Sequence, residues 1–193
     1  MRDIRLTFEG AYSYTKRKDG VETIQFLKRC IDSLHTCSVL DGTACVGADT
    51  ISFGLNCRVV HAIEMDSENW NALQHNVNLY NLKNVHLHKG DTTIIYRKYP
   101  SDILYLDPPW RGLGYKQKNI VDLYLGDKRV DKFLQDSVLA EDSAWRPQWI
   151  ILKLPFNYNW ERLTTLRGLE AMHSLRIRNY RIVVLRSGVP RHW

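Results

Sequence analysis

Residues 39–50 decide the fold, and they read VLDGTACVGADT. The apolar run 37–40 predicts a buried strand that ends at Asp41, and the spacing of apolar residues over 48–55 predicts a helix. Between the two lies a turn of small residues. A strand, a tight turn and a helix in this order are typical of an α/β fold with a parallel sheet.

The turn also indicates the kind of ligand. Gly42 and Gly47 permit a left-handed backbone and let backbone N–H groups at the start of the helix approach a bound molecule closely. The turn lacks the Gly-x-Gly-x-x-Gly fingerprint of dinucleotide sites, and the chain contains no Gly-Lys-Ser/Thr of a P-loop. Both absences favour a nucleoside ligand without a pyrophosphate.

Strand and helix patterns alternate through the rest of the chain. Helices are expected over about 19–34, 67–80, 130–138 and 160–166, and further strands over 58–63, 85–88, 103–106, 149–154, 171–177 and 181–185. Ser67 is the expected N-cap of its helix, and the segment up to Lys18 is expected to be irregular. We expect one domain, 1–193, with a short extension (1–35) before a core (36–193) built on a seven-stranded, mostly parallel sheet that ends in an antiparallel hairpin.

The chain is basic, with a formal net charge of +6 and a pI near 9.2. This balance suits a polyanion such as nucleic acid, and a solvated basic surface gives the same composition. The arginines over 176–191 fit a nucleic-acid track or, more simply, the charged outer faces of antiparallel strands.

The sequence gives no sign of export, membrane insertion or metal binding. The first residues lack the apolar core of a signal peptide, and no apolar run is long enough to span a bilayer. We expect an intracellular monomer, with nucleus and cytoplasm left open. The four cysteines form no Cys-x-x-Cys pair, so we expect reduced, mostly buried thiols and no metal site.

Acidic residues close four of the expected strands: Asp41, Glu64, Asp91 and Asp107. The carboxyl ends of parallel strands meet at one edge of the sheet, where ligands bind, so these side chains should converge. Glu64 is placed to accept from both ribose hydroxyls, although it fits a surface acid equally well. Asp91 is placed to meet an adenine amino group or to cap the next helix. Taken jointly, the positions describe a site for S-adenosylmethionine.

The run 104–110 reads LYLDPPW and ends in a stiff ledge. Pro108 and Pro109 fix their own φ angles and push the residue before each towards an extended backbone. Asp107 and a ledge carbonyl can each accept a hydrogen bond from an exocyclic amino group, and Trp110 can stack on the ring that carries it. Asp-Pro-Pro alone is a common turn, but this combination favours a planar nitrogen nucleophile.

These motifs, in this order, resemble the class I methyltransferases that act on amino groups, above all the trimethylguanosine synthase family of RNA cap guanine-N2 methyltransferases. The ledge and its continuation to Tyr115 carry the most specific likeness, and 12–15 (YSYT) and 154–157 (LPFN) match two further family segments. The resemblance implies a Rossmann-like class I methyltransferase fold, S-adenosylmethionine as cofactor, and transfer to N2 of 7-methylguanosine in the 5′ cap of an RNA.

The resemblance also implies roles for single residues. Asp107 and the Pro108 carbonyl would hold the N2 amino group, and Trp110 would stack on the cationic 7-methylguanine ring. Cofactor contacts are expected from Asp41, Thr43, Gly47, Glu64, Met65, Asp91 and Asp107. Substrate contacts are expected from Trp110, Tyr115, Arg111, Lys16 and Asn157. Arg111, Lys116 and Lys118 either take the triphosphate bridge or belong to a solvated, mobile basic loop.

Two substitutions depart from the family pattern, because Cys45 and Arg111 each stand where the family has glycine. Three alternatives stay open. An adenine-N6 methyltransferase of DNA or RNA shares the ledge, and a guanine-N2 methyltransferase of rRNA or tRNA is similar but usually has Tyr or Phe at position 110. A non-catalytic cap- or RNA-binding module could keep the same fold.

Overall fold

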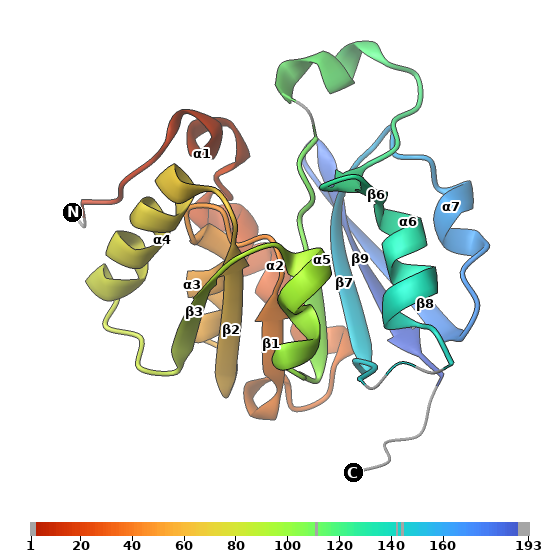
Figure 1. Ribbon diagram of the computed structural model, residues 1–193, viewed down its shortest axis with the longest axis horizontal. Helices are drawn as coiled ribbons and strands as arrows, with labels where there is room; N and C mark the ends of the chain where they lie inside the picture. The colour runs from red at the N-terminus through yellow and green to blue at the C-terminus, as the bar shows by residue number, and fades with distance from the viewer. Residues whose placement is uncertain (1–2, 111, 142, 144, 189–193) are drawn as a thin grey trace.

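The computed structural model describes residues 3–110, 112–141, 143 and 145–188. Its main sheet has seven strands in the order β3-β2-β1-β4-β7-β9-β8 (Figure 1). Their bounds are β1 (Ser38–Asp41), β2 (Val59–Glu64), β3 (Val85–Lys89), β4 (Ile103–Leu106), β7 (Trp149–Pro155), β8 (Leu169–Ile177) and β9 (Tyr180–Ser187). The first five strands in this order pair in parallel, and β9 runs antiparallel to both β7 and β8. The predicted fold class is confirmed.

Helices cover both faces of the sheet (Figure 1). One face packs against α2 (Arg17–Cys30), α3 (Ala48–Gly54) and α4 (Ser67–Leu79), and the other against α5 (Thr92–Ile95), α6 (Val130–Phe133) and α7 (Glu161–Thr164). A π-helical turn (Leu134–Val138) continues α6, so the two together fill the helix expected over 130–138. Each face of the sheet therefore has its own apolar core, and the central strands β1, β4 and β7 are buried on both sides, whereas the edge strands β3 and β8 are partly exposed.

The segment before α2 is not irregular as expected. It forms α1 (Phe8–Ser13), whose N-cap Thr7 accepts a hydrogen bond from the Gly10 N–H. The N-cap of α4 is Asp66 rather than Ser67, because the Asp66 carboxylate accepts from the N–H groups of Glu68 and Asn69. Both differences follow from short polar side chains that satisfy the free N–H groups of a first turn.

The segment after the ledge is also more ordered than expected. Gly112–Gln117 forms a 3₁₀ turn, η3, which rises in green above the ends of β7 and β9 in Figure 1. A small hairpin follows, formed by β5 (Tyr124–Leu125) and β6 (Lys128–Arg129), which the sequence patterns did not indicate. All four cysteines are free thiols, with Cys37 and Cys57 buried and Cys30 and Cys45 only partly so. Among the described helices, none is long and apolar enough to cross a bilayer.

Candidate active site

A cavity of about 1160 Å³ opens at the carboxyl edge of the parallel strands. Its walls come from the turn after β1, the end of β2, the ledge after β4 and the tip of the β8–β9 hairpin. The structure brings these expected site residues onto its lining: Lys16, Thr43, Glu64, Met65, Asp91, Asp107, Pro108, Trp110 and Tyr115. Asp41, Gly47 and Asn157 are outside this lining, and Arg111 lies outside the described residues.

Asp41 holds the turn after β1 through hydrogen bonds. Its side chain is fully buried, and it accepts hydrogen bonds from the Thr50 hydroxyl (2.6 Å) and the Thr43 N–H (3.2 Å). Burial raises the pKa of Asp41 to about 7, against the opposing effect of the Thr50 hydrogen bond. The structure therefore gives Asp41 the role of tying the end of β1 to the start of α3.

Two left-handed residues shape the same turn. Gly47 has a φ of +94°, and a Cβ at this position would come within 2.8 Å of the Leu73 side chain, so only glycine fits without a shift. Cys45 has a φ of +47°, a conformation that glycine adopts far more easily. Cys45 adopts this left-handed conformation without being glycine, and its N–H donates to Glu64 (2.8 Å).

The acids after β2 and β3 both reach the cavity. Glu64 accepts one backbone N–H on each oxygen, from Cys45 (2.8 Å) and from Asp66 (2.7 Å), and burial raises its pKa. Asp91 caps α5, because its Oδ1 accepts from both the N–H and the hydroxyl of Thr93, each at 2.8 Å. The capping role proposed for Asp91 is confirmed, and its carboxylate still lines the cavity.

The ledge is fixed to the turn and walled by aromatic rings. The Asp107 N–H donates to the Thr43 hydroxyl at 2.6 Å. Trp110 meets Tyr115 edge-on at 5.2 Å between ring centroids, and it lies 6.2 Å from Tyr180. These three rings, which we call the aromatic box, line the cavity together with Asp107. Such walls suit a flat ring whose edge reaches a carboxylate.

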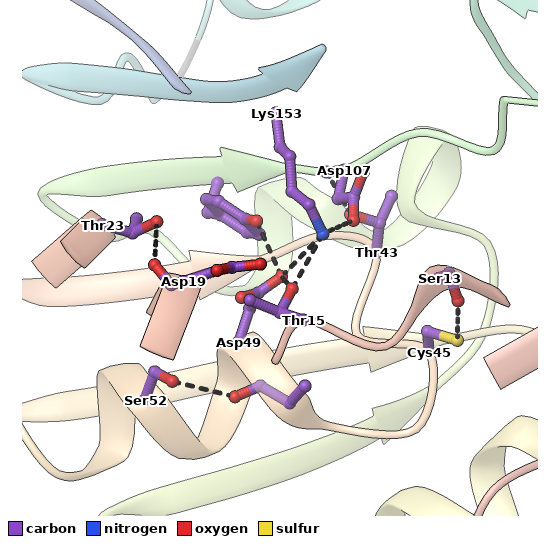
Figure 2. Close-up of polar contacts among 12 residues, drawn as sticks. Ser13, Thr15, Asp19, Thr23, Thr43, Cys45, Asp49, Ser52, Asp107 and Lys153 are labelled. Carbon is purple, nitrogen blue, oxygen red and sulfur yellow. Dashed lines mark hydrogen bonds and ion pairs between the residues drawn. The ribbon is translucent and has the colours of Figure 1, made fainter. Parts of the chain in front are cut away.

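Lys153 is the main site residue that the sequence reasoning missed. It projects from β7, is only 4% exposed, and places its Nζ 2.6 Å from Asp107 Oδ2 and 2.8 Å from the Thr15 hydroxyl (Figure 2). Its Nζ also lies 3.6 Å from Asp49 Oδ2. Lys153 is the single charged residue in the run WIILKLP at 149–155. A buried charge needs a partner, so a lysine within this apolar run could have indicated a buried ion pair with an acidic residue.

Asp49 completes the cluster from the opposite side. Its Oδ2 accepts from the hydroxyls of Thr15 (3.0 Å) and Tyr105 (2.8 Å). Burial raises the pKa of Asp107 to about 6, and Lys153 limits the rise. Burial disfavours a charged Lys153, but Asp107 and Asp49 together raise its pKa above the usual value. The cluster therefore holds Asp107 as a positioned carboxylate near neutral pH.

Cations line the outer part of the cavity. Lys16, Lys116 and Arg178 all reach its lining, and Arg178 also pairs with Asp19 at 2.9 Å. Lys118 instead lines a separate cavity of about 340 Å³ on which Trp110 and Tyr115 also border. In the part of the chain that the structure describes, no group of three or more His, Cys, Asp or Glu side chains could hold a metal ion.

Asn157 binds the backbone of the segment that follows the ledge. Its amide nitrogen donates to the backbone carbonyls of Tyr115 (2.7 Å) and Lys118 (2.8 Å). It therefore fixes the segment that follows the ledge, and its expected contact with substrate stays a prediction.

Comparisons with known proteins indicate the family of the chain. A family model described as RNA cap guanine-N2 methyltransferase matches residues 36–187. An uncharacterized protein of Acanthamoeba polyphaga mimivirus is 29% identical over 126 residues, covering 64% of this chain and 48% of that protein. The trimethylguanosine synthase of Schizosaccharomyces pombe is 26% identical over 127 residues, covering 62% of this chain and 52% of that protein. The chain thus spans about half the length of these curated relatives.

Solved structures share the fold at low sequence identity. A T. thermophilus 16S rRNA N2 G1207 methyltransferase, in complex with AdoMet and guanosine, superimposes with a TM-score of 0.67 and 17% identity, covering 90% of this chain and 44% of that one. A second structure, TrmN from Thermus thermophilus, gives a TM-score of 0.59 at 17% identity, covering 84% of this chain and 47% of that one. At these identities the likeness shows the methyltransferase fold.

Proposed function

The chain belongs to the family of RNA cap guanine-N2 methyltransferases, and from that premise we propose that it methylates the exocyclic N2 of 7-methylguanosine in an RNA 5′ cap, using S-adenosylmethionine. The observation that carries this proposal is the aromatic box of Trp110, Tyr115 and Tyr180 beside the Asp107 carboxylate. The 7-methylguanine ring is cationic, and an indole face attracts a cation more strongly than the other aromatic side chains do.

The inner part of the cavity fits S-adenosylmethionine. A carboxylate offers about four acceptor positions, so Glu64, which already accepts from backbone N–H groups, can still accept from ribose. Asp91 uses Oδ1 to cap α5, which leaves Oδ2 for an adenine amino group. Thr43 and Met65 line the same space. When bound, the cofactor supplies an electrophilic methyl group.

Asp107 positions the nucleophile in this proposal. Its carboxylate and the Pro108 carbonyl would accept hydrogen bonds from the N2 amino group, which orients the nitrogen lone pair. N2 loses one proton when it is methylated, and Asp107, with a pKa of about 6, can receive it. Lys153 keeps the carboxylate charged and fixes the oxygen to which it is bonded. Most of the rate gain would come from this positioning.

The outer cations would bind the triphosphate bridge. Lys16, Lys116 and Arg178 line the cavity and come from three separate segments of the chain. Phosphate oxygens accept charge-assisted hydrogen bonds from such side chains. These residues lie in the same cavity as the aromatic box, so one ligand can reach both.

A transfer assay with labelled S-adenosylmethionine tests the proposal. The acceptors are 7-methylguanosine triphosphate, unmethylated GTP and an adenine-containing DNA oligonucleotide, with cofactor binding measured in parallel. We expect label on the 7-methylguanosine compound alone. Label on the oligonucleotide alone would move the activity to adenine N6. No label on any acceptor, with intact cofactor binding, would contradict methylation of a free cap nucleotide and favour a longer RNA substrate or a binding module.

A further inference from the structure

A cluster of arginines and aromatic rings lies outside the cavity, and we call it the arginine–aromatic patch: Phe156, Trp160, Arg176 and Arg181. The Arg176 guanidinium carbon lies 4.4 Å from the centroid of the Phe156 ring. Arg181 lies 5.8 Å from the same ring and 5.3 Å from the Trp160 ring. Arg176 is exposed, and the other three side chains are partly buried. In Figure 1 the patch belongs to the side of the molecule where β8, β9 and α7 lie together.

These two arginines differ from the other two on the same hairpin. Arg178 pairs with Asp19 at 2.9 Å, and Arg186 pairs with Glu170 at 3.5 Å. Among the described residues, no carboxylate forms an ion pair with Arg176 or Arg181. The rings hold these two guanidinium groups in place while their charge stays uncompensated.

The strand register places the two uncompensated guanidinium groups unfavourably when no ligand is bound. Arg176 and Arg181 stand directly opposite each other across the β8–β9 pair. Like charges at opposed positions destabilise a sheet. The Arg181 Nε is in addition buried without a hydrogen-bond partner, and such a group carries a desolvation penalty. A bound polyanion would compensate both charges.

The patch is adjacent to the mouth of the cavity. Arg178, Asn179 and Tyr180 at the hairpin tip line the cavity, and the Arg176–Arg181 pair is the next pair behind the tip pair Ile177–Tyr180. One strand residue spans about 3.3 Å. The loop that starts with Phe156 also carries Asn157, which holds the backbone of Tyr115. Successive strand residues point to opposite faces, and Tyr180 packs in the core of one face while Trp160 packs against the core of the other. A chain that leaves the aromatic box would therefore reach the patch by passing around the hairpin tip.

We propose that the arginine–aromatic patch binds the first nucleotides of the RNA that follow the cap. The inference rests on the proposed cap methylation. Exposed single-stranded bases stack on guanidinium planes as well as on rings, and Arg176, backed by Phe156, presents such a plane. Arg181 neutralises the neighbouring phosphate. The site thus distinguishes a capped RNA from a free cap nucleotide, because only the RNA extends to the patch.

The test compares two substrates with three proteins. The substrates are 7-methylguanosine triphosphate and a capped RNA of about ten nucleotides, and the proteins are wild type, the double variant R176Q/R181Q and the matched control R186Q. Arg186 lies on the same hairpin, is exposed and is already ion-paired. We expect the double variant to raise the KM for capped RNA about tenfold, as the loss of one stacked base predicts. The KM for the triphosphate should stay within twofold for all three proteins.

Salt dependence separates phosphate binding from a packing effect. Loss of one phosphate contact to a single strand should flatten the plot of log Kd against log salt by about 0.7, measured by fluorescence anisotropy with the capped RNA. Equal affinity and salt slope in the double variant and wild type would overturn the inference, because the arginines would then only cover the rings. Equal losses on both substrates would overturn it as well. If wild type methylates neither substrate, the proposed function fails, while the anisotropy measurement still shows whether the patch binds RNA.

Discussion

The Nζ of Lys153 lies 2.6 Å from Oδ2 of Asp107, so a buried ion pair joins β7 to the ledge that follows β4. The two side chains are 5% and 15% exposed. At such low solvent exposure an unpaired charge is strongly unfavourable. The pair therefore fixes both the charge and the direction of the carboxylate on which the proposed reaction depends.

Lys153→Met should destabilise the protein and shift its pH profile. Removing one partner of a buried ion pair typically costs about 3–5 kcal/mol, which denaturant unfolding would measure. Burial already raises the pKa of Asp107 to about 6, and loss of the ammonium raises it further. As the pH is lowered, activity that needs the Asp107 carboxylate should then be lost at a higher pH in the variant than in wild type. Lys89→Met, on the exposed edge strand β3, is the matched control. An unchanged pH profile with full stability would contradict the role of Lys153.

Asp107→Asn should abolish turnover and leave cofactor binding intact. The amide keeps the shape of the side chain but loses the negative charge that positions N2 and receives its proton. Groups in this role typically contribute about 10²–10⁴ in rate. Calorimetric titration with S-adenosylmethionine is the paired measurement. If affinity for the cofactor fell as far as turnover, Asp107 would belong to the cofactor site instead.

Trp110→Ala should weaken binding of the methylated cap more than binding of unmethylated GTP. A desolvated cation over an indole face is worth about 2 kcal/mol, so the affinity for 7-methylguanosine triphosphate should drop roughly thirtyfold. The variant removes a tryptophan of the site and so changes the fluorescence signal itself; isothermal titration is therefore the measurement. Equal losses for the two nucleotides would indicate plain stacking without recognition of the positive ring.

Asp41 should make the protein less stable as the pH rises from about 4 to 7. Its pKa is about 7 in the fold, against 3.8 for the ordinary group. Between these values the native state binds more protons than the unfolded state, so the free energy of unfolding falls with pH, by at most about 4 kcal/mol. In Asp41→Asn the part of this slope that Asp41 contributes should disappear, while the contributions of Asp107 and Glu64 remain. Urea unfolding at several pH values checks it, and an identical slope in the two proteins would contradict the prediction.

The mostly parallel sheet, its antiparallel hairpin and its carboxyl edge could be predicted from the sequence, whereas the order of the strands in the sheet came from the structure. The apolar runs and the acids that close them gave the positions of Glu64, Asp91 and Asp107, because strand ends in a parallel sheet share one edge. The LYLDPPW run also identified Trp110. These are local patterns, and each is complete within about ten residues.

The contacts around Lys153 could not be predicted in the same way. Thr15 and Lys153 are 138 positions apart, and only the packing of α2 and α3 on the sheet brings Thr15 and Asp49 under β7. Side-chain direction decided two other cases. Asp41 and Asn157 both belong to the expected motifs. However, the Asp41 side chain accepts from Thr50 instead of lining the cavity, and the Asn157 side chain donates to the backbone of Tyr115. Sequence position alone does not fix either direction.

The central claim is that the nitrogen acceptor is N2 of 7-methylguanine. The most direct test is to incubate the wild-type protein with a 7-methylguanosine-capped RNA and S-adenosylmethionine, digest the product to nucleosides and identify them by tandem mass spectrometry. The account predicts a methyl group on N2 of the cap guanine, with the internal nucleosides unchanged. A methyl group on an adenine, or on a guanine within the RNA, with the cap guanine unchanged, would contradict it.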